Sequence, residues 1–372
     1  MFTLSHRDGY ARRGRLVLPH GPVETPVFMP VATAATIKSI DTADIQAMGY
    51  RILLANTYHL ALRPGVEIVE ALGGIRGMMT YDGNILTDSG GYQVFSLSDR
   101  RKILENGVQF QSHLDGSTHM FTPESVQELQ RRFGSTIVMP LDICPPGDGD
   151  RVTMAEACRT TRRWYLQAVA AKPTGLLYGI AQGGTFPDMR REEILWMVEQ
   201  NPPGMALGGF SVGEERSKFW DTLAAVADVL PSHIPVYVMG VGDPRDLVYC
   251  VSQGVDMFDC VLPTRNARNG RLYVRNGYYN VHRKELASLD RPPDPDCNCP
   301  TCSRYSIGYL RHLCTASELS FYRYATLHNL HWFARLMQTM REQLEAGTYQ
   351  SWARAYLSNW VGNYSDPVAL LR

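Results

Sequence analysis

The sequence predicts an α/β fold, specifically a (β/α)8 TIM barrel with a small subdomain inserted near the C-terminus. Three observations predict it. Eight short apolar segments rich in β-formers recur along the chain, and segments with helical periodicity separate them. Three cysteines then crowd together after the last apolar segment. The chain has 372 residues, 44% of them hydrophobic, which is enough for one large core.

The predicted strands leave room for a helix between most neighbours. They are Val27–Val31, Arg51–Ala55, Asn84–Thr87, Thr136–Leu141, Leu176–Ala181, Met205–Leu207, Val236–Met239 and Met257–Leu262. Helical patterns between them include Pro123–Phe133, Thr153–Ala171, Asp188–Glu199 and Lys218–Leu230. Apolar strands that alternate with helices indicate a parallel sheet covered on both faces. Eight such units favour a closed barrel, and an open doubly wound sheet is the alternative.

Two segments depart from this pattern and predict β-hairpins. Val108–Phe121 alternates around Asp115-Gly116, which favours a type I′ turn, and Arg271–His282 alternates around Asn276-Gly277. A helical C-terminus is expected from about Ser317. We therefore expect a catalytic barrel over residues 1–275, a cysteine-containing subdomain over 276–345, and a helical segment over 346–372 that packs on the barrel.

Charge and hydropathy exclude several classes of protein. Lys+Arg and Asp+Glu balance at 37 each, so any contact with nucleic acid must come from a local basic patch. The polar N-terminus does not resemble a signal peptide, and no apolar run approaches the length of a membrane span. Eight cysteines in a chain of this size do not indicate a disulfide framework. We expect a soluble, cytoplasmic protein without a membrane partner.

Polar residues and glycines follow the predicted strands or lie within their last part, where barrel enzymes carry their chemistry. They are Asn56, Asp88, Asp142, Gln182-Gly183-Gly184, Gly208-Gly209, Met239-Gly240 and Asp259. A single Asp at such a place is as easily a helix N-cap or a turn former. Three carboxylates on one rim raise one another's pKa, so together with glycines that admit a ligand they favour a functional site.

These residue types suit the exchange of a base on a ribose. One carboxylate can attack C1′ as a nucleophile while a second moves protons for the leaving and entering groups. A third can accept the adjacent N1–H and N2–H2 donors of guanine, and Gln182 with the Gly209 N–H could address O6.

The cysteine cluster predicts a closed structural zinc site. Cys297, Cys299 and Cys302 supply three thiolates, and His328 follows on a segment with helical periodicity. By spacing alone His331 and His312 are also available as the fourth ligand. The alternative is three unrelated buried thiols, but the flanking Pro, Asp and Asn residues make a poor core. We expect one zinc per chain, in a zinc-binding subdomain.

Several longer motifs carry a resemblance to a known family. They are Asn56-Thr57-Tyr58-His59-Leu60, Thr87-Asp88-Ser89-Gly90-Gly91-Tyr92-Gln93, Ser112-His113-Leu114-Asp115-Gly116, Met239-Gly240-Val241-Gly242, Asp256-Met257-Phe258-Asp259-Cys260-Val261-Leu262-Pro263-Thr264-Arg265 and the cysteine cluster with its distant histidine. In this order, and over nearly the whole chain, they resemble the bacterial tRNA-guanine transglycosylases.

The resemblance implies an activity and a role for each site residue. The family exchanges guanine at the first anticodon position (position 34) of G-U-N tRNAs in queuosine biosynthesis, as a pentosyltransferase. Asp259 matches its nucleophile, Asp88 its proton acceptor and donor, and Tyr92 and Met239 the residues that sandwich the base. Cys297, Cys299, Cys302 and His328 match its zinc ligands. The implied substrate-binding set is Asp88, Ser89, Gly90, Gly91, Tyr92, Asp142, Cys144, Gln182, Gly208, Gly209, Val212 and Met239.

The resemblance also implies partners. Two segments match the contacts with the anticodon loop of tRNA, namely Gly240, Val241, Gly242, Asp243, Pro244, Arg245, Asp246 and then Thr264, Arg265, Asn266, Ala267, Arg268. Arg245, Arg265, Arg268 and Arg271 would form the basic patch, and a solvated arginine face is the alternative. The target base would be flipped out of its loop. Bacterial members form homodimers.

The entering base is expected to be 7-aminomethyl-7-deazaguanine. Eukaryotic members, which accept the bulkier queuine, carry Gly where this chain has Val212 and Val where it has Cys144. Phe210-Ser211 stands where many bacterial members carry Leu-Ala, so queuine is the alternative. A non-catalytic zinc-containing subunit is a second alternative, and both Asp88 and Asp259 argue against it. A sugar-acting barrel glycosidase and an archaeal-type enzyme with extra C-terminal domains fit less well.

Overall fold

A computed structural model describes residues 1–97, 101–147, 149–366 and 368. The parallel strands are β4 (Val27–Pro30), β5 (Ile52–Ala55), β6 (Asn84–Thr87), β10 (Ile137–Val138), β11 (Leu176–Leu177), β12 (Gly179–Ala181), β13 (Met205–Leu207), β14 (Val236–Val238) and β15 (Met257–Cys260). Each lies within a segment that the sequence predicts as a strand, and several are shorter than expected. The α/β fold with parallel sheets is therefore confirmed.

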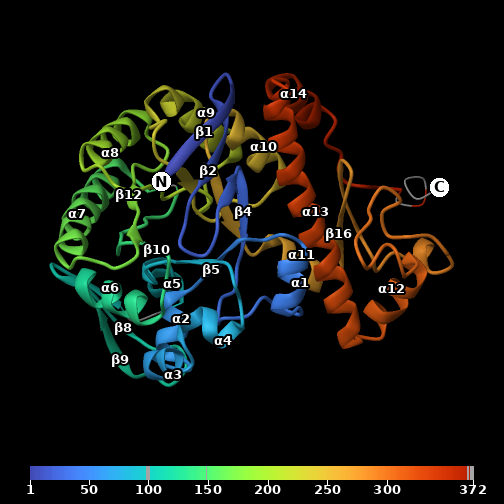
Figure 1. The fold of residues 1–372 in the computed structure, drawn as a ribbon, viewed down its shortest axis with the longest axis horizontal. Coiled ribbons are helices and arrows are strands. Elements are labelled where there is room, and N and C mark those ends of the chain that lie inside the picture. The colour runs from blue at the N-terminus through green and yellow to red at the C-terminus, as the bar shows by residue number, and fades with distance from the viewer. Residues whose placement is uncertain (98–100, 148, 367, 369–372) are drawn as a thin grey trace.

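Helices follow most of these strands and surround them (Figure 1). They are α1 (Thr42–Ala47), α2 (Thr57–Leu62), α3 (Val66–Ala71), α4 (Gly74–Met79), α5 (Gly91–Leu97), α6 (Pro123–Arg132), α7 (Arg151–Ala170), α8 (Pro187–Glu199), α9 (Arg216–Val226) with the 3₁₀ turn η1 (Ala227–Val229), α10 (Pro244–Ser252) and α11 (Leu262–Arg268). The four predicted helices correspond to α6, α7, α8 and α9. In α6 the Thr122 side chain accepts from the Ser125 N–H and Pro123 opens the helix, as the sequence indicates.

The strand pairings give two parallel sheets rather than the single closed sheet that we expected. Their orders are β11-β10-β6-β5 and β12-β13-β14-β15-β4. The reason on one side is that the predicted strand 176–181 is interrupted at Tyr178, so that β11 and β12 pair with different neighbours. On the other side, Val31, which follows β4, makes one isolated bridge to Leu54 of β5. A closed barrel is thus not confirmed by the pairing.

Both faces of the parallel strands are buried. One core cluster takes a side chain from nearly every strand, for example Met29, Leu86, Ile180, Ala206 and Met257. Alternate residues on the same strands, such as those at 28, 85, 207, 236 and 258, join a second cluster with the surrounding helices. This is the burial expected of parallel strands that have helices on their outer face.

A small antiparallel sheet opens the chain, which the sequence did not predict. It comprises β1 (Phe2–Asp8), β2 (Ala11–Leu16) and β3 (Val23–Thr25). Leu16, Leu18 and Val23 belong to the same core cluster as the inner side chains of the parallel strands. The sheet therefore contributes side chains to that cluster.

Both predicted hairpins form, but neither has the predicted turn. β8 (Gly107–Gln111) pairs with β9 (Thr118–Phe121), with β7 (Arg101–Leu104) beside them. Its loop spans Ser112–Ser117, and Gly116 but not Asp115 has a positive φ, which excludes type I′. In the second hairpin, β16 (Arg271–Val274) and β17 (Gly277–Asn280) pair Val274 with Gly277, so the turn is Arg275-Asn276.

The C-terminal part has a core of its own and is joined to the α/β body by one long helix. It contains η2 (Lys284–Leu286), α12 (Ile307–Thr315) and β18 (Gly362–Asn363). By contrast, α14 (Tyr349–Ser358) packs on the α/β body, where Tyr349 and Ala353 join the main core and the Tyr349 hydroxyl donates to the Val248 carbonyl of α10. The helix α13 (Leu319–Glu345) runs between the two parts (Figure 1), and its Phe333 ring lies 4.9 Å from Phe28 of β4. None of the helices in the described ranges is long and apolar enough to cross a membrane.

Candidate functional site

Asp88 follows β6 and is held by four N–H donors. Its Oδ1 accepts from the backbone N–H groups of Thr57 and Gly90, at 2.9 and 3.2 Å. Its Oδ2 accepts from the side-chain amides of Asn56 and Gln93. Burial raises the pKa of Asp88 to about 6, although the hydrogen bonds from Asn56, Thr57 and Gln93 lower it. The charge of Asp259 raises it further. A carboxyl group with this pKa can exist in both protonation states near neutral pH.

Asp142 lies four residues after β10 and contacts two other predicted site residues. The Gln182 side chain donates to its Oδ2 at 2.7 Å, and the Ser89 hydroxyl donates to its Oδ1 at 3.5 Å. Burial raises the pKa of Asp142 to about 7, and the charge of Asp88 contributes.

Asp259 lies within β15, and one of its two oxygens is held firmly. The Tyr237 hydroxyl and the Gly240 N–H both donate to Oδ1, at 2.5 and 2.8 Å. Burial raises the pKa of Asp259, whereas these two donors favour its charged form. Oδ2 has no hydrogen bond among the described residues, so it is the oxygen available to react.

The three carboxylates are near enough for their charges to interact. The charge of Asp259 acts on Asp88, and the charge of Asp88 acts on Asp142. They come from β6, β10 and β15, at the carboxyl ends of parallel strands. The sequence prediction that these residues share a rim is consistent with this coupling. A cavity of about 850 Å³ lies elsewhere, at the starts of β4 and β5, and contains none of these residues.

Glycines surround the carboxylates where side chains would collide. A Cβ on Gly90 would lie 3.0 Å from the Tyr58 nitrogen, and one on Gly91 would lie 3.2 Å from the Asp142 carbonyl oxygen. A Cβ on Gly208 or Gly209 would lie 2.6 or 2.7 Å from the Gln182 amide. The glycines therefore allow the strand-end loops to pack closely around the Asp142–Gln182 pair.

Further predicted substrate-binding residues lie beside this pair. Burial raises the pKa of the Cys144 thiol to about 12, and the Gly209 N–H faces its sulfur. The Gln182 Oε1 atom is buried without a hydrogen-bond partner in the described part of the chain. Tyr92 is 51% exposed and Met239 is half-buried. An exposed aromatic ring and an unsatisfied buried oxygen are features of a site that binds a planar polar ligand.

The segments expected to contact RNA are mostly buried. Among their charged residues, Arg265 is exposed, and Arg245 and Arg268 are partly exposed. Arg245 pairs with Asp243 at 3.0 Å, and Arg216 bridges Asp243 and Asp246. The side chains of Val241, Pro244, Thr264, Asn266 and Ala267 are buried and hold the two segments in the fold.

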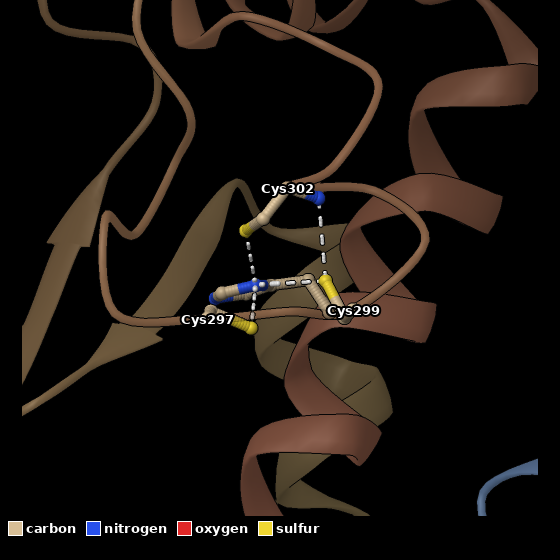
Figure 2. A group of neighbouring side chains, drawn as sticks. Cys297, Cys299 and Cys302 are labelled. Carbon is tan, nitrogen blue, oxygen red and sulfur yellow. Dashed lines mark hydrogen bonds between the residues drawn. The ribbon is translucent and has the colours of Figure 1, made fainter.

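The predicted metal ligands meet in one place. The ligand atoms of Cys297, Cys299, Cys302 and His328 all lie within 4.8 Å of one another. The His328 Nδ1 atom lies 3.8, 3.6 and 3.3 Å from the three sulfurs, close to the roughly 3.5 Å that tetrahedral zinc requires. Figure 2 shows the three thiols gathered by one loop beside a helix. This group could hold a metal ion.

The hydrogen bonds of the histidines distinguish the fourth ligand from its alternatives. The His328 Nε2 atom lies 2.7 Å from the Tyr273 carbonyl, which leaves Nδ1 to face the thiols. His331 instead bonds to Asn298 through Nε2 at 2.9 Å. The ring of His312 stacks with Tyr309. Neither belongs to the cluster.

Sequence reasoning missed several residues that hold the site together. They are Thr57, Gln93 and Tyr237 at the carboxylates, Glu214, and the buried Arg190. Glu214 accepts from the N–H groups of Ser211 and Val212, close to the predicted wall of the base pocket. Gln93 and Tyr237 carry a weak signal, since one ends a motif and the other lies in a predicted strand, but their partners are distant in sequence.

Comparisons with known proteins agree with the motifs. A family model described as queuine tRNA-ribosyltransferase matches residues 7–361. Relatives with that name include a protein of Solidesulfovibrio magneticus, 49% identical over 355 residues, which cover 94% of this chain and 95% of that protein. One of Herpetosiphon aurantiacus is 46% identical over 98% of this chain and 92% of its own length. One of Neisseria meningitidis is 44% identical over 96% of this chain and 98% of its own. Because the family model spans nearly all of the sequence, this chain belongs to the queuine tRNA-ribosyltransferase family.

Proposed function

We propose that this protein exchanges guanine at the first anticodon position of G-U-N tRNAs for 7-aminomethyl-7-deazaguanine, in queuosine biosynthesis. The observation that carries the proposal is the partly buried Asp259 carboxylate, whose charge acts on Asp88 and whose Oδ1 is held while Oδ2 has no hydrogen bond among the described residues. Family membership supports the same reaction, that of a pentosyltransferase.

The first half of the reaction belongs to Asp259. Its Oδ2 attacks C1′ of the target nucleotide, a bond forms between these atoms, and the C1′–N9 bond breaks with its electron pair leaving on guanine. Tyr237 and Gly240 hold Oδ1 and favour the carboxylate over the carboxylic acid, which offsets part of the effect of burial. Attack from the face opposite the base inverts the configuration at C1′.

The second half reverses these steps with a new base, and Asp88 moves the protons. Protonated Asp88 supplies the proton that the leaving guanine needs, and the resulting carboxylate takes the N9 proton of the entering base. N9 then displaces Asp259 from C1′, and the second inversion restores the β-anomer of tRNA. The pKa of Asp88, about 6, allows both protonation states to be used near neutral pH.

Asp142, Gln182 and Gly209 are proposed to recognise the base edge. The Asp142 carboxylate would accept N1–H and N2–H2, and the Gln182 amide with the Gly209 N–H would donate to O6. Tyr92 and Met239 would cover its two faces, which suits the exposed ring of Tyr92. Ser89, Gly90, Gly91, Cys144, Gly208 and Val212 complete the proposed pocket.

The anticodon loop would approach through Gly240–Asp246 and Thr264–Arg268. Gly240 joins this surface to the reaction because its N–H holds Asp259. Arg265, Arg268 and Arg271 lie on the neighbouring surface, and Arg271 stacks over Tyr278 at 4.1 Å. Phosphate contacts from these cations would position the loop, and the base would be flipped toward Asp259.

Two structural proposals accompany this function. The Cys297–Cys299–Cys302–His328 group is proposed to hold one structural zinc, since its four donors fill a tetrahedral shell. The two parallel sheets are proposed to form one (β/α)8 barrel wall, because side chains from both meet in a single inner cluster. The domain boundaries at residues 275 and 345 stay predictions. Helix α13 belongs to the predicted zinc subdomain, and it packs on β4 of the predicted barrel.

We further propose a cytoplasmic homodimer. All eight cysteines are free thiols, which suits a reducing compartment. Tyr305, Tyr309 and Tyr324 form an aromatic cluster in which Tyr309 is 43% exposed, and such a cluster suits an interface between two copies. Sedimentation velocity tests this assembly.

The covalent intermediate tests the proposed reaction directly. Asp259→Asn should abolish both the incorporation of labelled guanine into tRNA and the protein–tRNA adduct that survives denaturation, because an amide cannot replace the nucleophilic carboxylate. The exposed Asp221→Asn, as a control, should leave both unchanged. An Asp259→Asn protein that still forms the adduct would show that another group attacks C1′.

The non-catalytic subunit is the second candidate. It predicts tRNA binding without adduct or exchange by the wild-type protein. The interaction between the buried Asp88 and the partly buried Asp259 favours the enzyme, because two neighbouring carboxylates have no benefit for binding RNA phosphates.

A further inference from the structure

Arg190 is a fully buried arginine whose guanidinium, in the described part of the chain, hydrogen-bonds to backbone carbonyls alone. It lies on α8 and is 0% exposed. Its Nε and one terminal nitrogen donate to the Gly184 carbonyl at 3.0 and 2.8 Å. The remaining bonds reach the carbonyls of Ala181 at 3.2 Å and Gly208 at 3.0 Å. No ion pair with a carboxylate is formed among the described residues, and the ring of Phe210 lies 3.8 Å below the guanidinium.

A buried cation without a carboxylate partner is costly to keep. Burial lowers the pKa of Arg190 to about 10, so the group still carries its charge at neutral pH. Its position is fixed by packing, because a Cβ on Gly183 would lie 2.7 Å from the Arg190 backbone. The charge is therefore directed at a defined set of carbonyl dipoles.

These carbonyls belong to the two loops that carry the proposed O6 donors. Ala181 and Gly184 flank Gln182-Gly183, and Gly208 shares a peptide unit with the Gly209 N–H. In a trans peptide the C=O and N–H point in opposite directions. Since the Gly208 C=O faces Arg190, the Gly209 N–H must face away from α8, and there it meets the Cys144 sulfur beside Asp142.

We propose that Arg190 is a positioning residue for base recognition, which aims and polarises the Gly209 N–H that receives the 6-oxo group of the base. A cation bound to the C=O of an amide makes the N–H of that amide a stronger donor. The buried ring of Phe210 packs against the Arg190 guanidinium. Phe210, which stands where many bacterial members carry Leu, therefore holds Arg190 in place and does not line the base pocket itself. The inference rests on the proposed function.

The test compares two inhibitors of guanine exchange, 7-deazaguanine and its analogue 2-amino-7-deazapurine, which lacks the 6-oxo group. The ratio of their inhibition constants measures the contribution of the 6-oxo group. In Arg190→Met, which keeps the apolar length but has no donors, this ratio should fall about tenfold while the KM for tRNA changes less than about twofold. Arg190→Lys has one cationic group for three carbonyls and should give an intermediate ratio.

Arg191→Met is the matched control, because Arg191 lies on the same helix and, among the described residues, bonds to Asp228 and the Ala225 carbonyl at the surface. It should leave the ratio unchanged. Equal weakening of both inhibitors in Arg190→Met would show a merely structural role and overturn the proposal. If the Met variant does not fold, the Lys variant decides, and an unchanged ratio there overturns it as well. Failure of the wild-type protein to exchange guanine would instead overturn the proposed function.

Discussion

At the scale of single residues, burial gives the three site carboxylates their chemistry. It raises the pKa of Asp88 to about 6 and of Asp142 to about 7, and it raises the pKa of Asp259 as well. Asp259 differs from the other two because a tyrosine hydroxyl and a backbone N–H share one oxygen and leave the second free. The environment, rather than the residue type, assigns different roles to three aspartates.

The pKa of Asp142 predicts how base binding depends on pH. Only the carboxylate accepts both donors of the guanine edge, and it is lost as the pH falls through about 7. The KM for the entering base should therefore rise by up to about tenfold for each pH unit below that value. Steady-state kinetics between about pH 5.5 and 8.5 measure this, and Asp142→Asn, which has no carboxyl group to titrate, serves as the control. A constant KM for the base across this range would contradict the prediction.

Val212 predicts a preference between entering bases. It is half-buried beside Glu214, and its branched side chain is rotamer-stiff. Forcing a larger base against this side chain should cost about 1–3 kcal/mol. We therefore expect kcat/KM to be roughly tenfold to a hundredfold higher for 7-aminomethyl-7-deazaguanine than for queuine. Val212→Gly should shift that ratio toward queuine. Equal or better use of queuine by the wild-type protein would reverse our choice of substrate.

At the scale of elements, distant segments fasten the parallel strands. Asp256 precedes β15 and is fully buried, and both of its oxygens accept from Arg12 of β2. It also accepts from the Val236 N–H at the start of β14. The N-terminal sheet thereby holds two neighbouring strands, one of which carries Asp259. Asp256 belongs to the same motif as Asp259, yet its contacts are structural.

The Arg12–Asp256 pair predicts a large loss of stability when one partner is removed. Asp256→Asn should lower the free energy of unfolding by about 3–5 kcal/mol, because it leaves a buried guanidinium without its countercharge. Denaturant unfolding measures the loss. Glu128→Gln, which breaks the exposed pair with Arg131, should cost less than about 1 kcal/mol. Similar losses in both variants would show that the buried ion pair contributes no more to stability than the exposed one.

At the scale of the whole molecule, two cores are joined by α13. One core is a cluster of buried side chains from α11, β16, β17, η2, α12 and the start of α13, and it is separate from the core of the parallel strands. His328 lies on α13, the same helix that packs Phe333 on Phe28. A metal held by His328 and the three cysteines would therefore fix the subdomain to the helix that covers β4.

Loss of the metal should destabilise the C-terminal part without removing a catalytic group. Purified protein should contain one zinc per chain, and Cys302→Ser should lose it, because the binding energy of a structural zinc contributes to folding. Elemental analysis and limited proteolysis measure the two effects. Cys314→Ser is the control, since Cys314 lies in the same subdomain beside His282 and outside the cluster. A zinc-free variant with unchanged protease resistance and tRNA affinity would show that the site is not structural.

The sequence by itself determined the features that depend on neighbours along the chain. Thr122 and Pro123 predict the start of α6 because N-capping is local. The spacing of Cys297, Cys299 and Cys302 predicts a metal-ligand group because one short loop carries three donors. The apolar segments predict the parallel strands, and the aspartates that follow two of them and lie within a third predict the candidate carboxylates.

Tertiary structure decided what depends on approach between distant segments. Gly277 lies in β17, where a Cβ would be 2.2 Å from the Gly362 carbonyl oxygen of β18. Glycine is therefore needed here for the close approach of the two strands and not for the predicted turn. Tyr178 interrupts a strand that the sequence presents as continuous. Tyr237 reaches Asp259 across 22 positions, and Arg190 gathers carbonyls from two loops. The pattern of apolar residues predicts which side chains are buried, but not which segments they pack against. Many packing arrangements would bury the same side chains, and only the tertiary structure shows which one forms.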